Sequence, residues 1–218
     1  MLKRVQHDEW WVVALALLAT GCIPPPRYPA RTLAPPPRET PEAYRQCLAD
    51  LSALGAKVEA LPDRVFDNGC SATSSVKMVA IGIPVTNLGA VKCGLAQPFV
   101  RWVTEAVQPA ARARFGTYVA KMESFGSFAC RPVNNVAGNR LSEHGRANAV
   151  DIAAFQLADG RRVTVLADWN GPDDAARGFL RDLHAAACRR FSVVLGPDAN
   201  ALHRDHLHFD MGRGPYCR

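Results

Sequence analysis

The sequence predicts an α+β domain in which a small antiparallel sheet is flanked by helices and stapled by disulfides. Three observations predict this fold class. Helix-like and strand-like segments interleave, the clearest strand pairing is a tight hairpin, and six cysteines are spread over residues 41–218. A tight hairpin joins antiparallel neighbours, whereas a doubly wound parallel sheet needs a crossover connection after each strand.

Three segments have the apolar spacing of helices. The first begins at Thr40, a preferred N-cap residue followed by Pro41 at the first helical position, and is expected to end near Gly55. The second is expected to begin at Pro98 and to be interrupted by Pro109. The third is expected over 173–190, where apolar residues recur at helical intervals.

The strand signals are short runs rich in β-branched residues, separated by glycine and asparagine. Residues 150–157 and 162–166 enclose a turn that contains Asp159 and Gly160, which is typical of a β-hairpin. The other strands are expected around Val65, at 76–79, around Val91, near Tyr118 and, as the last strand of the chain, at 206–211.

The start of the chain has the features of an export signal. Lys3 and Arg4 precede an apolar run over 10–19, which is shorter than the roughly 20 residues of a membrane-spanning helix. We therefore expect a signal peptide over 1–21. The run ends in Ala-Thr-Gly-Cys, which resembles the lipobox of bacterial lipoproteins and makes Cys22 a candidate lipidation site. The alternative is a cysteine that follows an ordinary cleavage site.

Residues 22–40 are rich in proline, which blocks helix and sheet and favours extended polyproline II conformations. This segment is expected to be a linker, either a spacer between a lipid anchor on Cys22 and the domain at 41–218 or a plain N-terminal tail. The predicted location is the periplasm or cell envelope, with the lipid holding the protein to a membrane, inner or outer.

The cysteine count agrees with export. Setting Cys22 aside from the seven cysteines leaves an even number, and no Cys-x-x-Cys pair typical of a zinc cluster occurs. Three disulfides are expected, and their pairing stays open because six cysteines allow fifteen connectivities. The six are Cys47, Cys70, Cys93, Cys130, Cys188 and Cys217.

The chain has 26 Lys and Arg residues against 20 Asp and Glu, a net charge of +6. This moderate excess suits an anionic cell-wall polymer or lipid surface, and it equally suits an ordinary solvated surface. No compact basic run with interleaved aromatic residues occurs, so a nucleic acid is not expected as a partner.

Two motifs carry candidate chemistry. The segment HRDHLHFD at 203–210 places three of the six histidines within six positions. On a strand, His206 and His208 share one face while Leu207 points into the core. The segment SEHGRANAVD at 142–151 contains a loop that brings His144 to the start of a strand carrying Asp151. If the two strands are neighbours, two imidazoles and a carboxylate converge, as at a catalytic zinc site with an open fourth position.

These segments, together with Cys130-Arg131 and VLGPDAN, resemble the bacterial extensin-like C-terminal domain family. The resemblance covers roughly 43–218. That family is similar to the superfamily of lysostaphin, D-Ala-D-Ala metallopeptidases and hedgehog, whose signature is a His and an Asp separated by six residues and followed later by His-x-His.

The resemblance implies that His144, Asp151 and His208 bind Zn²⁺ and that His206 is the catalytic histidine beside the metal. It also implies that His203 is a catalytic or oxyanion-stabilising group. Some relatives have a catalytic Glu where this chain has Asp205, so the base is either His206 or Asp205.

Three further residues are assigned from chemistry. Arg131 is expected to bind a substrate carboxylate through its planar fork, or else to be a surface residue beside a disulfide. Ser142 and Glu143 are expected to orient His144 by hydrogen bonds. His184, by contrast, is expected to be an ordinary structural histidine.

The expected function is that of a zinc peptidase that hydrolyses peptide amide bonds of peptidoglycan, as a D,D-endopeptidase or a carboxypeptidase. The choice between these two stays open. Two other hypotheses remain. One is a non-catalytic cell-envelope binding module that keeps the metal for stability, and the other is a zinc-free protein held only by disulfides.

Overall fold

A computed structural model describes residues 39–218. The predicted signal peptide, the candidate lipidation site Cys22 and almost all of the predicted linker lie outside the described residues. None of the helices within the described part is long and apolar enough to cross a membrane.

The N-terminal part of the domain is a helix beside a small sheet. Helix α1 (Pro41–Ala53) begins as predicted, since the Thr40 side chain accepts a hydrogen bond from the Ala43 amide at its N-terminus. Strands β1 (Lys57–Ala60), β4 (Ser75–Ala80) and β5 (Val91–Lys92) form a three-stranded antiparallel sheet beside it. Strands β2 (Arg64–Val65) and β3 (Ser71–Ala72) form a separate two-stranded ribbon.

The second predicted helix differs from expectation at both prolines. It begins at Cys93 rather than Pro98, because the buried Cys93 and its neighbours pack in the core and outweigh the proline. Pro109 does not interrupt it: α2 (Cys93–Trp102) continues through a π-helical turn (Val103–Val107) into α3 (Gln108–Phe115). The Gln108 amide donates to the Val103 carbonyl five residues back, and this wider turn precedes the proline ring.

A six-stranded sheet forms the centre of the domain and confirms the α+β prediction. Strand β7 lies between β6 and β10, the sheet runs in the order β11-β9-β10-β7-β6, and β8 also pairs with β7. All pairings are antiparallel except that of β11 with β9. The strands are β6 (Val119–Gly126), β7 (Ala149–Leu157), β8 (Arg162–Thr164), β9 (Val193–Leu195), β10 (Leu207–Asp210) and β11 (Tyr216–Cys217).

The hairpin of β7 and β8 is confirmed, although its second arm is shorter than predicted. The Thr164 side chain accepts a hydrogen bond from the Ala167 amide and so starts a short helix, α4 (Val165–Asp168). Strand β10 is also not the last of the chain, because the following residues return to the sheet edge as β11.

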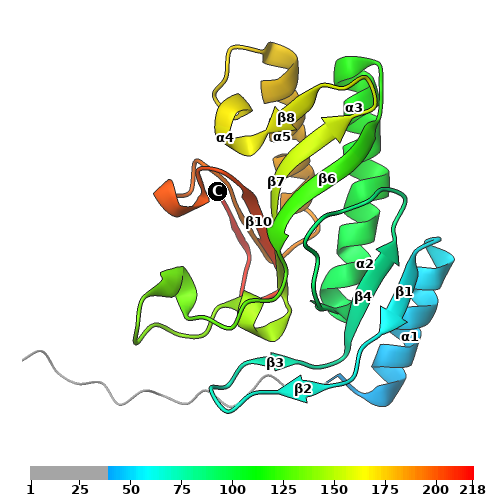
Figure 1. The fold of residues 1–218 in the computed structure, drawn as a ribbon, viewed down its shortest axis with the longest axis vertical. Helices are drawn as coiled ribbons and strands as arrows, with labels where there is room; N and C mark the ends of the chain where they lie inside the picture. The colour runs from blue at the N-terminus through cyan, green and yellow to red at the C-terminus, as the bar shows by residue number, and fades with distance from the viewer. Residues whose placement is uncertain (1–38) are drawn as a thin grey trace, which may run out of the picture. The chain divides into compact units, whose positions relative to one another are not determined.

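Helices α2, α3 and α5 (Asp174–Cys188) cover one face of this sheet (Figure 1). The indole of Trp102 packs edge-on against Phe209 of β10 and donates a hydrogen bond to the Leu183 carbonyl of α5. Phe179 of α5 contacts Phe155 of β7. The polar motifs of His144, Asp151 and His208 lie on the opposite face of β7 and β10.

The six cysteines predicted to pair do so. The disulfides join Cys47 to Cys93, Cys70 to Cys130 and Cys188 to Cys217. The first fastens α1 to α2, the second fastens β3 to the loop before the His144 motif, and the third fastens α5 to the edge strand β11.

We expect the loss of the Cys188–Cys217 disulfide to lower the free energy of unfolding by about 3–4 kcal/mol, because it closes a loop with a sequence separation of 29 residues. The test is urea unfolding of the double serine variant against the parent, with both proteins oxidised. A loss below about 1 kcal/mol would show that this crosslink does not constrain the unfolded chain.

Candidate metal centre

The register between strands β7 and β10 positions two residues of the candidate metal centre. In the antiparallel pairing of β10 with β7, His208 lies directly opposite Asp151. Leu207 and Phe209 point to the helix-covered face and are fully buried there, as the predicted alternation requires. The condition stated from the sequence, that the strands of Asp151 and His208 are neighbours, is therefore met.

An irregularity in β7 turns Asp151 away from the core. Glu123 pairs with Ala154 but Ser124 pairs with Ile152, which leaves Ala153 as an extra residue. Strict alternation would place Asp151 on the same face as the core residue Phe155. With one extra residue between them, Asp151 faces the site, and re-aiming a side chain is a common role of β-bulges beside functional sites.

His144 reaches the site from a short 3-10 turn, Glu143–Arg146. The Ser142 side chain accepts a hydrogen bond from the His144 amide, so it fixes the backbone of the turn rather than the ring. The imidazole Nδ1 lies 3.2 Å from the Ser127 carbonyl, which can only accept. Nδ1 therefore donates a hydrogen bond to that carbonyl, and Nε2 is directed at Asp151 and His208.

Gly145 in this turn has no room for a side chain. A Cβ there would lie 2.9 Å from the Leu141 side chain and 3.1 Å from the sulfur of Cys70. The Cys70–Cys130 disulfide therefore packs directly behind the turn that carries His144.

Three donor atoms converge with the spacing of a metal site. His144 Nε2 lies 3.0 Å from Asp151 Oδ2 and 3.3 Å from His208 Nδ1, and His208 Nδ1 lies 2.8 Å from Asp151 Oδ1. Tetrahedral zinc with bonds of about 2.0–2.1 Å places its ligand atoms about 3.3 Å apart. All three residues are buried, and two nitrogens with one oxygen form a donor set that suits zinc.

Asp210 completes the centre, and the sequence interpretation missed it. Its Oδ2 lies 2.9 Å from His208 Nε2, while its Oδ1 accepts from the Gly212 amide at 2.7 Å. A carboxylate behind a metal-binding imidazole fixes the tautomer and orientation of the ring. The signal was present in the chain, because Asp210 follows His208 by two positions on the same strand face.

The charges at the centre are strongly coupled. Burial disfavours the charged form of His208, but the hydrogen bonds with Asp151 and Asp210 outweigh this and raise the pKa of His208 to about 9. Burial likewise opposes the ionised form of Asp151, yet His144 and His208 hold the pKa of that carboxyl well below its usual range. A proton on His208 thus takes the place of a cation between two carboxylates.

His206 lies beside the triad and outside it. Its Nδ1 lies 2.9 Å from Asp205 Oδ1, and its Nε2 faces Asp151 Oδ1 at 3.6 Å. The exposed ring of Phe125 packs edge-on against the imidazole. Within residues 39–218, Asp205 hydrogen-bonds to His206 and to no member of the triad.

His203 has a neutral partner instead. The Asn200 side-chain oxygen accepts from the Leu202 amide, which identifies that atom as oxygen, and it lies 2.9 Å from His203 Nδ1. Nδ1 is thus the protonated nitrogen. Burial and the positive charges of His208 and His206 lower the pKa of His203 to about 4. A neutral ring with Nδ1–H has an acceptor at Nε2.

Two other predicted residues lie at the site without touching the triad. Glu143 hydrogen-bonds to Asn148 at 2.8 Å and pairs with Arg146 at 3.4 Å, so it supports the turn instead of orienting the His144 ring. Arg131 lines the hollow above the triad, which has a volume of about 360 Å³.

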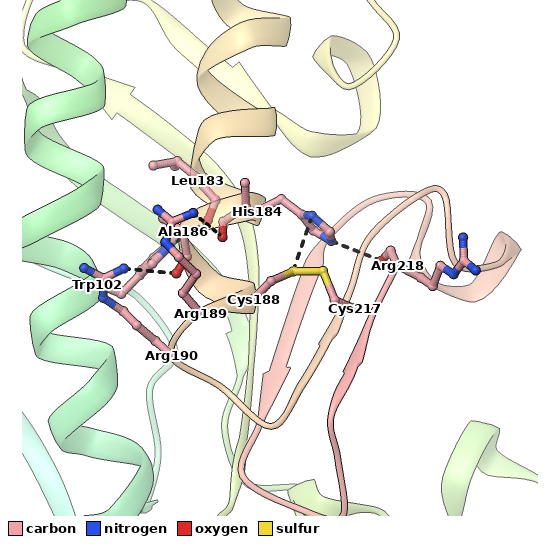
Figure 2. The surroundings of a disulfide bond; sticks show 10 residues. Trp102, Leu183, His184, Ala186, Cys188, Arg189, Arg190, Cys217 and Arg218 are labelled. Atoms are coloured by element: carbon pink, nitrogen blue, oxygen red, sulfur yellow. Dashed lines mark hydrogen bonds between the residues drawn. A yellow bond between two sulfur atoms is a disulfide. The ribbon is translucent and has the colours of Figure 1, made fainter.

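A second group of possible ligands consists of His184, Cys188 and Cys217. Figure 2 shows why it differs from the first: the two sulfurs are joined in a disulfide, with the His184 ring beside them. His184 Nε2 lies 3.1 Å from the Arg218 carbonyl. Because both cysteines are in a disulfide, this group joins β11 to α5 and offers no thiolate to a metal.

The family described as extensin-like protein C-terminus matches the chain over residues 45–218. No curated protein and no solved structure matches the sequence.

We expect the Asp210→Asn variant to bind zinc about 10–100-fold more weakly, because the amide no longer supports His208 as a carboxylate does. Asp205→Asn is the matched control, since Asp205 contacts no ligand of the triad. Competition with a chromophoric chelator measures both affinities. Equal weakening by the two variants would refute the specific role of Asp210.

Zinc binding at pH 7 is expected to release about one proton per ion. The metal-free His208, with its pKa raised to about 9, must lose a proton to ligate, so the apparent affinity falls as the pH is lowered below 9. Calorimetric titration in two buffers of different ionisation enthalpy counts the protons. Binding without proton release would exclude His208 as a ligand.

Proposed function

Because the chain belongs to the extensin-like protein C-terminus family, we propose that it is a zinc-dependent peptidase that hydrolyses amide bonds in the peptides of peptidoglycan. The observation that carries the proposal is the buried triad of His144, Asp151 and His208 with a separate imidazole, His206, beside it. The substrate class rests on the resemblance of the two histidine motifs to those of the D-Ala-D-Ala metallopeptidase superfamily.

His144, Asp151 and His208 would hold the ion, and a set of three protein ligands would leave room for water or substrate on the side of the hollow that they line. Zinc supplies Lewis-acid chemistry to such a site, where it polarises a carbonyl and makes water acidic near neutral pH. The hollow exposes this side to a substrate, while the buried carboxylates of Asp151 and Asp210 neutralise a divalent charge.

His206 is the residue best arranged to move the proton. The Asp205 carboxylate holds the proton of His206 on Nδ1, so the Nε2 lone pair faces the site. Taking up a second proton there makes an imidazolium that Asp205 stabilises. This contact supports His206 as the base and Asp205 as its orienting partner in the proposed mechanism.

His203 has a different task in this proposal. Its Nε2 is an acceptor at the same site, so it receives a hydrogen bond from a substrate N–H or from water. The envelope location and the lipid anchor on Cys22 complete the proposal, since an exported chain meets peptidoglycan where it acts.

The central test is zinc content together with cleavage. We expect the mature chain, purified with its disulfides formed, to bind one zinc ion and to release peptide fragments from purified peptidoglycan, identified by mass spectrometry. Bound zinc without cleavage would favour a binding module that keeps the metal for stability. Absence of bound zinc would contradict both the zinc peptidase and the metal-containing binding module.

The His206→Ala variant is expected to keep its zinc and to lose about 10²–10⁴-fold in kcat, the usual contribution of a general base. Asp205→Asn should also keep zinc and lose less, because the imidazole remains. Asp159→Asn, at an exposed turn where its carboxylate pairs with Arg161, is the matched control. Full activity of His206→Ala would move the base elsewhere.

A further inference from the structure

Three hollows adjoin one another around the candidate metal centre, which lies where the first two share residues. The arginine hollow, of about 360 Å³, is lined by the triad and by Arg131, Arg140 and Arg213. The central hollow, of about 330 Å³, shares Arg131, His206 and the triad residues His144 and Asp151 with it. The sheet hollow, of about 670 Å³, shares Phe125 and Asp205 with the central hollow.

The sheet hollow continues the same face of the sheet. Its floor is formed by β6, β7 and β8 and includes Ala153, the extra residue of β7 two positions beyond Asp151. Phe125 is likewise an extra residue of β6, because Ser124 pairs with Ile152 and Gly126 with Asp151. The two irregularities that turn Asp151 and Phe125 outward thus join the metal centre to the sheet hollow.

The two ends differ in chemistry. Among the described residues, no ion pair involves the three arginines of the arginine hollow, whereas Glu143 in the same wall is paired with Arg146. Unpaired guanidinium groups favour a carboxylate.

At the other end, the sheet hollow is lined by two cations and two carboxylates: the Glu123 carboxylate is paired with Arg162 at 2.6 Å, and Lys121 and Asp205 complete the set. Phe125 and Leu166 stand beside this pair with 59% and 64% of their surfaces exposed, so they offer apolar contact to a ligand.

Resting on the proposed function, we infer that the substrate is a cross-linked peptide that lies across the metal in a groove open on both sides. The bond cut is then internal to the peptide, and the protein is an endopeptidase. The carboxylate-bearing part of the substrate occupies the arginine hollow, and the less charged part lies over the sheet hollow. A carboxypeptidase needs space for only one residue beyond the bond that it cuts. In such an enzyme the sheet hollow would bind no part of the substrate.

Two defined substrates test this inference: a cross-linked muropeptide dimer and the pentapeptide monomer that ends in free D-alanine. The zinc-loaded protein is expected to cleave the dimer at the crosslink with a KM at least tenfold below that for the monomer. Release of D-alanine from the monomer without dimer cleavage would overturn the inference and leave the proposed function standing. No cleavage of either substrate would count against both.

A matched pair of variants tests the sheet hollow. Leu166→Ala is expected to raise KM for the dimer about threefold to tenfold with kcat unchanged, because it removes apolar contact far from the metal. Val79→Ala removes an exposed apolar side chain that lines none of the three hollows and should change nothing. Equal KM values for the two variants would overturn the inference.

Binding supplies a readout that does not depend on turnover. In the zinc-loaded His206→Ala protein, equilibrium binding of the dimer should be at least tenfold tighter than that of the monomer. The double variant Arg140→Gln, Arg213→Gln, made in the His206→Ala background, should bind the dimer at least tenfold more weakly. Its affinity for a dimer whose carboxylates are amidated should fall much less. Equal losses for both ligands would refute the assignment of the carboxylate to the arginine hollow.

Discussion

The pairing of β7 with β10 decides the geometry of the whole centre. Because His208 lies opposite Asp151 in this register, one carboxylate and one imidazole meet on the open face while Leu207 and Phe209 anchor the strand in the core. A slip of one residue would turn every side chain of β10 to the other face. The packing of Phe209 against Trp102 therefore helps to fix the position of His208 in the candidate metal centre.

The partner of each histidine sets its chemical role. His208 has carboxylates at both ring nitrogens, His206 has one carboxylate, and His203 has a neutral amide. The first arrangement holds a cation or a proton, the second suits an imidazole that gains and loses a proton, and the third keeps the ring neutral. Three histidines within six positions thus have three different electrostatic surroundings, supplied by Asp151 and Asp210, by Asp205 and by Asn200.

The elements best predicted from the sequence are those with local signals. The Thr40 cap, the Asp159-Gly160 turn and the alternation of polar and apolar residues around His208 depend on neighbours in the chain, and the structure confirms them. The π-helical turn before Pro109 and the extra residue at Ala153 depend on tertiary packing. Since β7 is almost wholly buried, its hydrophobic pattern carries no sign of the irregularity that turns Asp151 outward. The pairing of the cysteines could not be predicted from the sequence either, because it depends on which distant segments the fold brings together.

The positions of the disulfides suggest that an ion at the candidate metal centre would also constrain the chain. Two of the covalent loops interlock between residues 47 and 130, and the third closes residues 188 to 217. No disulfide connects these two regions. A metal held by His144, Asp151 and His208 would link the segment that lies between these two regions to the C-terminal one, joining positions 57 residues apart. Because the three ligands come together only in the folded chain, loss of the ion would remove its binding free energy from the folded state as well as remove the reactive group.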